Sequence, residues 1–345
     1  MTINLTELAT QMGVMLLIVA AGYLARRFSW LDPAADGAFS QIIVRMTAPC
    51  LVFYGIVGNR EKLLSGSLLQ VVLAVAGVVT LAGGLAMLLY RGRHLRPDHR
   101  SVLRVATMFG NVSFLGIPLC YGLFGQDDND SIDGGLGNDG LDGGLGNDSL
   151  DGGAGNDVLS YASGLMYASL YAAAQDALYW SVGVAMMRGG HGKLDWKRLV
   201  NPSLVGILLA VVLVATGVPV PAFLVKTAST VGAATLPLSL LVVGAGFHGV
   251  KLDGRTLAGL LPVAGLKLVL VPTLMVLALS LVPMDPMARA VLAMEMAMPS
   301  GAATVALART NGQDWQFAAG AVMLTTLLSA VTVPLTAVIL NRIGL

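Results

Sequence analysis

The chain has 345 residues, of which 55% are hydrophobic and only 12% are charged, and its mean hydropathy is +0.75. A soluble domain carries about 25% charged residues, so this composition excludes an ordinary soluble protein. The formal net charge of +1 conceals an asymmetry, because residues 126–164 hold nine Asp and no Lys or Arg, which leaves +10 on the rest of the chain. Two different kinds of sequence are therefore joined.

Apolar runs of about 20 residues, the length that crosses about 30 Å of hydrocarbon, recur along the chain. These runs are too long and continuous for the alternating strands of a barrel, so we expect an all-α multi-span membrane protein. The first run is interpreted as a retained span, because Glu7 precedes it and Arg26 and Arg27 follow it, unlike a cleaved signal peptide. Ten spans are predicted, near residues 8–28, 36–57, 66–90, 102–124, 164–187, 200–217, 222–248, 256–282, 287–308 and 315–341.

The distribution of Lys and Arg predicts the orientation of these spans. The loops after the odd-numbered spans are the basic ones, with Arg26 and Arg27 in the first and four arginines between Arg91 and Arg100 in the next. We therefore expect these loops in the cytoplasm. Both termini and the acidic segment would then lie on the external or periplasmic side of the cell inner (plasma) membrane.

Two halves of the chain share a pattern. Thr47-Ala48-Pro49 in span two matches Thr235-Leu236-Pro237 in span seven, and spans four and nine both contain glycine and proline in the middle of an apolar run. Five spans per half is an odd number, so the second half would insert upside down relative to the first, as in many secondary transporters. The predicted organisation is residues 1–125 for spans one to four, 126–163 for an insert, 164–199 for span five with a cytoplasmic loop, and 200–345 for the second repeat.

These residues resemble those of the auxin efflux carrier family of bacterial permeases and plant carriers, over nearly all of the chain except about 126–163. The resemblance implies ten helices in two inverted five-helix repeats, a scaffold and a transport domain with crossed broken helices four and nine, an elevator-like movement, and kinship in fold with bile-acid:sodium symporters. The motifs that carry it are Asn111, Gly116 and Pro118 in span four, the two Thr-x-Pro motifs, Lys267 and Pro272 in span eight, and Met298-Pro299-Ser300 in span nine.

Physical chemistry gives these residues a role at the substrate. A proline inside a span removes a backbone donor and opens the preceding turn, so Pro118 and Pro299 would expose peptide dipoles at membrane depth, although prolines also merely kink membrane helices. Half-helix ends of this kind bind ions. The predicted substrate-binding residues are Asn111, Gly116, Pro118, Pro299, Ser300, Thr47, Thr235 and Lys267.

Ionisable residues inside spans are costly and mark functional sites. Glu295 precedes Pro299 by one helical turn and is the first candidate to hold a coupling Na⁺ or H⁺; a structural glutamate is the alternative. Asp176 is a second coupling candidate. Lys267 would attract an anionic substrate or pair with an acid, the alternative being a side chain that extends to the membrane interface.

Residues 134–160 consist of three nonapeptides that resemble the calcium-binding repeat of RTX proteins, and a partial unit precedes them. The repeat implies a short parallel β-roll inserted in an external loop, of natural or engineered origin, with a flexible acidic linker as the alternative. Carboxylate oxygens are the ligands that Ca²⁺ prefers. The predicted calcium ligands are Asp130, Asp139, Asp148 and Asp157.

We therefore expect a secondary transporter that moves a small organic anion, either auxin-like or malate-like, within membrane lipid. A membrane-anchored external calcium-binding or adhesion protein is the alternative. An enzyme is not expected, because the four histidines form no cluster with acids and no nucleophile is paired with a base. No nucleic-acid partner is expected, and the substrate, the direction, the coupling ion and a homodimer stay open.

Overall fold

The computed structural model describes residues 5–57, 68–91, 96–117, 119–120, 163–188, 202–250 and 252–343, and four short strands between residues 131 and 159. Apart from these strands the described chain is helical, as predicted. The helices, with η for a π-helical turn, are α1 (Leu5–Arg27), α2 (Pro33–Ile42), η1 (Ile43–Thr47), α3 (Ala48–Val57), α5 (Leu68–Arg91), α6 (Pro97–Met108), η3 (Val112–Gly116), α8 (Ser163–Leu178), η4 (Tyr179–Gly183), α9 (Val184–Met187), α11 (Pro202–Thr216), α12 (Ala222–Ala233), α13 (Thr235–Gly246), α14 (Gly254–Gly265), η5 (Leu266–Leu270), α15 (Val271–Ser280), α16 (Pro286–Met296), α17 (Ala303–Thr310) and α18 (Trp315–Ile343).

Six described helical stretches are long and apolar enough to cross a membrane, which supports a multi-pass membrane protein. They match predicted spans one, two, three, seven, eight and ten. Of the other four predicted spans, the fifth corresponds to the consecutive α8, η4 and α9, the sixth corresponds to the 15-residue α11, and the fourth and ninth are each divided into two shorter helices. The number ten therefore stays a prediction. The six stretches are Leu8–Arg27, Ala38–Val57, Gln70–Arg91, Ala222–Gly246, Gly254–Ser280 and Trp315–Arg342.

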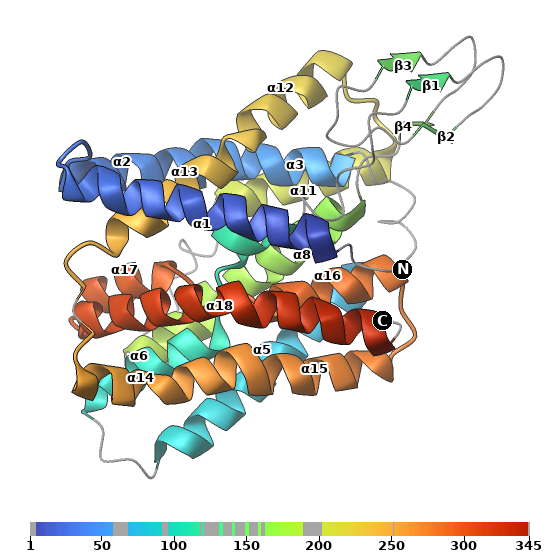
Figure 1. Cartoon of the computed structure of the whole chain (residues 1–345). Coiled ribbons are helices and arrows are strands. Elements are labelled where there is room, and N and C mark those ends of the chain that lie inside the picture. The colour runs from blue at the N-terminus through green and yellow to red at the C-terminus, as the bar shows by residue number, and fades with distance from the viewer. Residues whose placement is uncertain are drawn as a thin grey trace.

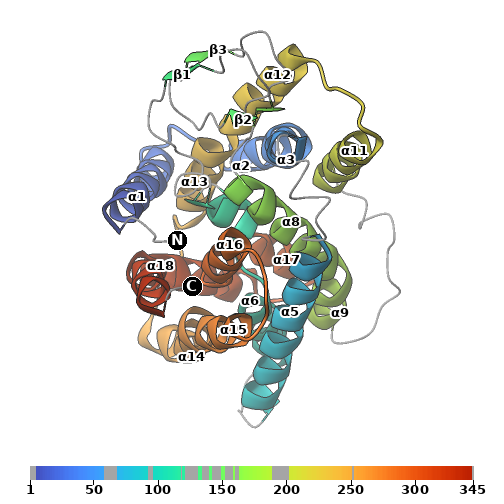
Figure 2. The same cartoon turned by 90° about the vertical axis from the view of Figure 1, so that its right-hand side faces the viewer.

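The helices form two groups, seen one above the other in Figures 1 and 2. The panel group, named here for its flat arrangement, contains α1, α2, η1, α3, α11, α12 and α13, in which α1 packs on α13 and α3 packs on both α11 and α12. The core group contains α5, α6 and α14 to α18. Helix α8 packs against α5 and α16 of the core group and also against α3, so it lies where the two groups meet.

Glycines allow the closest helix contact in the panel group. A Cβ atom at Gly22 of α1 would overlap the carbonyl oxygen of Leu241, and one at Gly244 of α13 would overlap that of Val19. Small residues permit such backbone approach between membrane helices, where packing replaces the hydrophobic effect as the driving force. The two glycines thus fix α1 against α13.

Three π-helical turns precede prolines. The turns η1, η3 and η5 end at Thr47, Gly116 and Leu270, and a proline follows two residues later in each case. A proline cannot donate to the carbonyl four residues before it and its ring crowds that carbonyl, so a locally widened turn relieves the conflict. The sequence therefore explains these turns locally; η4 (Tyr179–Gly183) has no such proline.

The four strands are β1 (Ser131–Asp133), β2 (Gly140–Leu141), β3 (Ser149–Asp151) and β4 (Val158–Leu159). Strand β1 pairs in parallel with β3 and β2 with β4, so that Ile132 lies opposite Leu150 and Leu141 opposite Leu159. Each pair is offset by two nonapeptides. The predicted calcium ligands Asp130, Asp139, Asp148 and Asp157 lie outside the described residues, so the complete β-roll and its calcium stay predictions.

Candidate functional site

Two interrupted helices cross inside the core group. The first interruption, at Phe109–Asn111, separates α6 from η3, and the second, at 297–302, separates α16 from α17. At the crossing, Gly110 and Ser300 form an antiparallel bridge. The Asn111 N–H donates to the Pro299 carbonyl at 2.7 Å, and the Gly301 N–H donates to the Phe109 carbonyl at 3.0 Å. The two breaks are therefore hydrogen-bonded to each other.

The position of the break in span nine was predicted correctly from the sequence, whereas the break in span four lies earlier in the chain than predicted. The interruption at 297–302 contains Pro299, as expected. The break in span four was expected at the turn before Pro118 and instead lies at Phe109–Asn111, where Phe109 is extended (φ −113°, ψ 123°). The turn before Pro118 is the π-helical η3 (Val112–Gly116), so the proline widens the helix there instead of ending it. Pro118 itself lies outside the described residues.

Three side chains hold the crossing in place. The Gln175 amide of α8 accepts from the Gly110 N–H at 3.1 Å and donates to the Gly110 carbonyl at 2.9 Å. The Ser300 hydroxyl donates to the Ala106 carbonyl at 2.8 Å, and the Ser300 N–H donates to the Thr325 hydroxyl at 3.1 Å. These bonds satisfy backbone groups that an interrupted helix leaves open, which hydrocarbon cannot do. Ser300, predicted to bind substrate, therefore uses its hydroxyl within the protein.

A cavity of about 130 Å³ lies on the α8 side of the crossing, between the panel and core groups. One water needs only about 10–15 Å³ by a similar measure, so the cavity accepts a molecule of several heavy atoms. Its lining combines aromatic rings with polar groups. The lining residues are Val44, Ala48 and Ser203 of the panel group, and Phe109, Gly110, Asn111, Ser113, Phe114, Gln175, Asp176, Tyr179, Trp180, Gly301, Ala302 and Ala303.

Asn111 and Tyr179 of the cavity lining each have a buried polar atom without a hydrogen-bond partner among the described residues, and the Asn111 amide lies at the crossing itself. The Asn111 side chain is only 3% exposed, and its Nδ2 atom has no hydrogen-bond partner among the described residues. Ala302 and Ala303, also in the lining, form the start of the eight-residue α17. A helix N-terminus carries positive partial charge. The cavity thus offers an unused amide donor beside a positive dipole end, with the partly buried Asp176 on the same wall.

A second set of buried groups lies on the other side of the crossing. Glu295 is 0% exposed, and neither of its carboxylate oxygens has a hydrogen-bond partner among the described residues. A Cβ at Gly116 would overlap this carboxylate, so Gly116 makes room for it. Lys267 is 1% exposed, and its Nζ atom lies 3.3 Å from the position of a Cβ at Gly110. Neither Glu295 nor Lys267 lines the cavity.

Thr47 and Thr235, the matched threonines of spans two and seven, both lie in the panel group. Thr47 is 4% and Thr235 0% exposed, and both hydroxyls are without a partner within the described ranges. Neither lines the cavity, although Ala48 beside Thr47 does. The predicted residues thus separate into Asn111 and Asp176 at the cavity, Glu295, Gly116 and Lys267 behind the crossing, and the two threonines in the panel.

Sequence reasoning missed three residues: Gln175, which binds the Gly110 peptide, Thr325, which accepts from the Ser300 N–H, and Tyr179, which lines the cavity. Gln175 could have been found from the sequence, because a glutamine beside an aspartate within an apolar span is unusual. Thr325 gives no such signal, because its hydroxyl also donates to the Ala321 carbonyl at 2.8 Å, as threonines in membrane helices often do.

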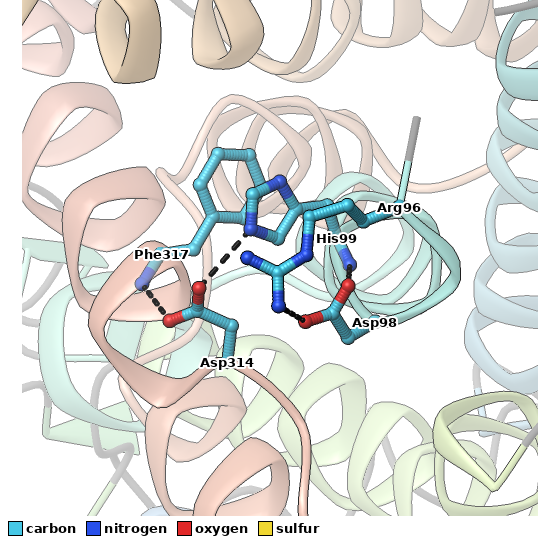
Figure 3. A network of polar contacts seen from close by, with 5 residues as sticks. All are labelled: Arg96, Asp98, His99, Asp314 and Phe317. Carbon is cyan, nitrogen blue, oxygen red and sulfur yellow. Dashed lines mark hydrogen bonds and ion pairs between the residues drawn. The ribbon is translucent and has the colours of Figure 1, made fainter. Parts of the chain in front are cut away.

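A polar network joins the first turns of α6 and α18 (Figure 3). The His99 Nε2 atom lies 3.1 Å from Asp314 Oδ2, and the His99 ring stacks on Phe317 at 3.9 Å between centroids. Arg96 pairs with Asp98 at 2.8 Å. Burial alone would raise the pKa of Asp314, but hydrogen bonds from the Phe317 N–H and His99, with the charges of His99 and Arg96, lower it below its ordinary value.

The expectation that no histidine clusters with acids was wrong, because Asp98, His99 and Asp314 lie together as potential metal ligands among the described residues, with ligand atoms within 4.8 Å of one another. The sequence could not show this, since Asp314 is 215 positions from His99. The carboxylates already accept hydrogen bonds from Arg96, from the His99 ring and from backbone N–H groups. The network therefore links the starts of α6 and α18 through hydrogen bonds of the protein itself, and its contact between the two helices is called here the His99–Asp314 latch.

Fold and crossing together define a multi-pass membrane protein in which two interrupted helices meet, an arrangement found in many membrane carriers. The sequence pattern of the family described as membrane transport protein matches residues 8–196 and 191–337, so the chain belongs to this family. It is 25% identical over 334 residues to an uncharacterized transporter of Methanothermobacter thermautotrophicus, covering 94% of this chain and 96% of that protein. A second uncharacterized transporter, of Methanocaldococcus jannaschii, is 21% identical over 328 residues, covering 93% and 95%. Family membership indicates transport rather than catalysis.

Proposed function

We propose that the protein is a secondary transporter that moves a small organic anion, a mono- or dicarboxylate, and binds it in the cavity beside the crossing. The observation that carries this proposal is the Asn111 amide, which is buried in the cavity wall with its donor unused. An unpaired buried donor is costly, so a ligand with acceptor oxygens gains the bond that the protein leaves unmade. The start of α17 adds attraction for negative charge.

Asp176 supports ion coupling at the same cavity. Its carboxylate shares the wall with Asn111, so a bound carboxylate would face a like charge unless Asp176 takes up a proton or a cation. Binding of the anion and of the proton would then favour each other. Glu295, the other coupling candidate, lies behind the crossing, where an ion from the cavity would have to pass Gly110 and Lys267.

The two helix groups support an elevator-type movement. The cavity has walls from both groups, with Ala48 and Ser203 on the panel side and the crossing on the core side. A shift of the core group along the panel would carry the cavity past a fixed barrier, which alternating access requires. The antiparallel bridge between Gly110 and Ser300 supports inverted halves, because it requires spans four and nine to run in opposite directions where they meet.

The positions of the loops support the proposed orientation. Figure 1 shows the described chain ends, near Leu5 and Ile343, and the short strands at one end of the helices. The turns that follow α1 and α17, near Arg26 and Arg309, lie at the opposite end. We propose that ten spans cross the inner (plasma) membrane of the cell. The arginine-bearing end would then face the cytoplasm, and both termini would lie outside.

We further propose that the strand segment is a small calcium-binding β-roll outside the transport path. Pairing at an offset of two nonapeptides supports this geometry, because in a two-repeat turn each strand stacks on the one two repeats later. Calcium there would order the insert and would not take part in transport.

Uptake of radiolabelled mono- and dicarboxylates into proteoliposomes tests the function. At least one acid should accumulate above protein-free liposomes, and Asn111→Leu should reduce its uptake at least about tenfold, as loss of a hydrogen bond to a charged group implies. Gln70→Leu, which removes an exposed amide on α5, is the matched control and should transport normally. The proposal fails if no carboxylate is taken up, or if both variants transport equally well.

A further inference from the structure

Three potential metal ligands lie together where α6 and α18 begin (Figure 3). They are one imidazole and two carboxylates, from His99, Asp98 and Asp314, and their ligand atoms all lie within 4.8 Å of one another. Zinc and its neighbours among the transition metals accept imidazole nitrogen together with carboxylate oxygen, whereas Mg²⁺ and Ca²⁺ prefer oxygen alone. The donor set therefore suits a transition metal.

Backbone N–H groups hold one oxygen of each carboxylate. Asp98 Oδ1 accepts from the His99 N–H at 3.0 Å, and Asp314 Oδ1 accepts from the Phe317 N–H at 2.9 Å. The two Oδ2 atoms instead contact side chains, that of Asp98 the Arg96 guanidinium and that of Asp314 the His99 ring. Carboxylates that bind metal ions are oriented by hydrogen bonds of this kind to a second set of groups. Both carboxylates are thus fixed through Oδ1 and can offer Oδ2 to a metal.

The His99 ring is also fixed. It stacks on Phe317 with 3.9 Å between centroids and 5° between planes, and its Nε2 atom lies 3.1 Å from Asp314 Oδ2. Two ligand atoms of a tetrahedral zinc ion, at bond lengths of about 2.1 Å, lie about 3.4 Å apart. A zinc ion can therefore bind between these two atoms after a small shift, and the Asp98 carboxylate has to approach them by up to about 1.4 Å.

Charge and access also suit a divalent ion. Two carboxylates balance the charge of one Zn²⁺ when the imidazole is neutral, as it must be to bind a metal. The three ligand side chains are 21–29% exposed, so an ion can reach them from water and keep a water molecule as a further ligand. The competing cation is Arg96, whose side chain is 68% exposed. An exposed ion pair contributes little stability, so a metal can displace Arg96 from Asp98.

We propose that Asp98, His99 and Asp314 form a zinc site that joins the start of α6 to the start of α18. Both helices hold the crossing, since a carbonyl of α6 and a hydroxyl of α18 bind Ser300. Zinc at their starts therefore stabilises the core group. The described lining of the transport cavity includes none of the three ligands, so the site is separate from the proposed transport path.

Thermal unfolding of the full chain, in detergent and without a histidine tag, tests the site with Zn²⁺ or Mg²⁺ at equal ionic strength. Zn²⁺ should raise the wild-type melting temperature by about 3 °C or more, because a ligand stabilises the state that binds it, and Mg²⁺ should not. His99→Gln should lose this rise, and in equilibrium dialysis it should bind one Zn²⁺ fewer per chain than the wild type. Arg96→Ala removes the competing cation and should tighten zinc binding by about two- to fivefold. His248→Gln, in the turn after α13, is the matched control and should respond like the wild type.

An equal rise in melting temperature for His99→Gln and the wild type would overturn the proposal, because zinc would then bind elsewhere. Equal stabilisation by Mg²⁺ would overturn it as well, since any divalent charge would then suffice, and so would a wild type that does not respond to zinc. If His99→Gln does not fold, Asp98→Asn gives the same comparison, and zinc binding by Arg96→Ala decides when neither of these variants folds. No readout uses transport, so the result is independent of the uptake experiment.

Discussion

The Glu295 carboxylate occupies the space that a Cβ atom at Gly116 would need. Only glycine at position 116 is therefore compatible with this place of the Glu295 side chain. The two residues are 179 positions apart and belong to the two interrupted spans. Their contact connects the first turn after one break to the last turn before the other. The crossing is therefore held by this contact as well as by the backbone bridge.

Gly116→Ala should destabilise the crossing. The added Cβ must displace the Glu295 carboxylate, and overpacking of a filled interior costs about 1–3 kcal/mol. The melting temperature should fall by several degrees. Gly77→Ala on α5 is the matched control, because a Cβ there meets nothing within 4 Å. Equal melting temperatures for the two variants would show that the carboxylate moves aside freely.

Gln175→Leu should lower the stability of the fold, because it removes both hydrogen bonds of the Gln175 side chain to the Gly110 peptide. The substitution leaves a buried N–H and carbonyl without partners, at about 1–3 kcal/mol for each unsatisfied group. Amide hydrogen exchange at Gly110, measured by mass spectrometry on peptides spanning the break, should accelerate. Gln70→Leu should leave exchange there unchanged, and protection that persists in Gln175→Leu would argue against the clamp.

Asp176→Asn should uncouple transport from the proton gradient. The amide keeps the shape of the cavity wall but cannot bind or release a proton, so uptake should continue with a loss of most of its pH-gradient dependence. The measurement is uptake into proteoliposomes with and without an imposed gradient. Asp253→Asn, at the exposed N-cap of α14, serves as the control. A variant that still responds fully to the gradient would remove Asp176 from coupling.

The His99–Asp314 latch should stabilise the protein more at neutral than at acidic pH. The pKa of Asp314 is lower in the folded state than its ordinary value, so its contribution is complete above the ordinary pKa and disappears as pH falls through the folded-state pKa. Asp314→Asn should cost about 0.5–1 kcal/mol at pH 7, as for a partly exposed pair, and much less near pH 3. Unfolding at several pH values checks this, and a cost that does not depend on pH would contradict it.

Calcium should protect the strand segment from proteolysis. Ordering of residues 131–159 by Ca²⁺ would slow cleavage there relative to chelator, while Mg²⁺, which dehydrates reluctantly and prefers octahedral sites, should have little effect. Deleting residues 126–163 should leave carboxylate uptake unchanged. Identical cleavage with calcium and with chelator would favour the flexible linker instead.

The sequence alone determined the membrane class, most helix positions and the break at Pro299, because hydrophobic length and proline act locally. The parallel pairing of strands two nonapeptides apart also agrees with its repeat.

Only the tertiary structure decided which of the predicted site residues lie close to one another. It put Asn111 and Asp176 at one cavity, Lys267 and Glu295 behind Gly110, and the Ser300 hydroxyl on the Ala106 carbonyl. A break in one span has a defined partner only once the other span crosses it, and residues nearly 200 positions apart then supply the hydrogen bonds that lipid cannot provide. No pattern within a single span contains that information.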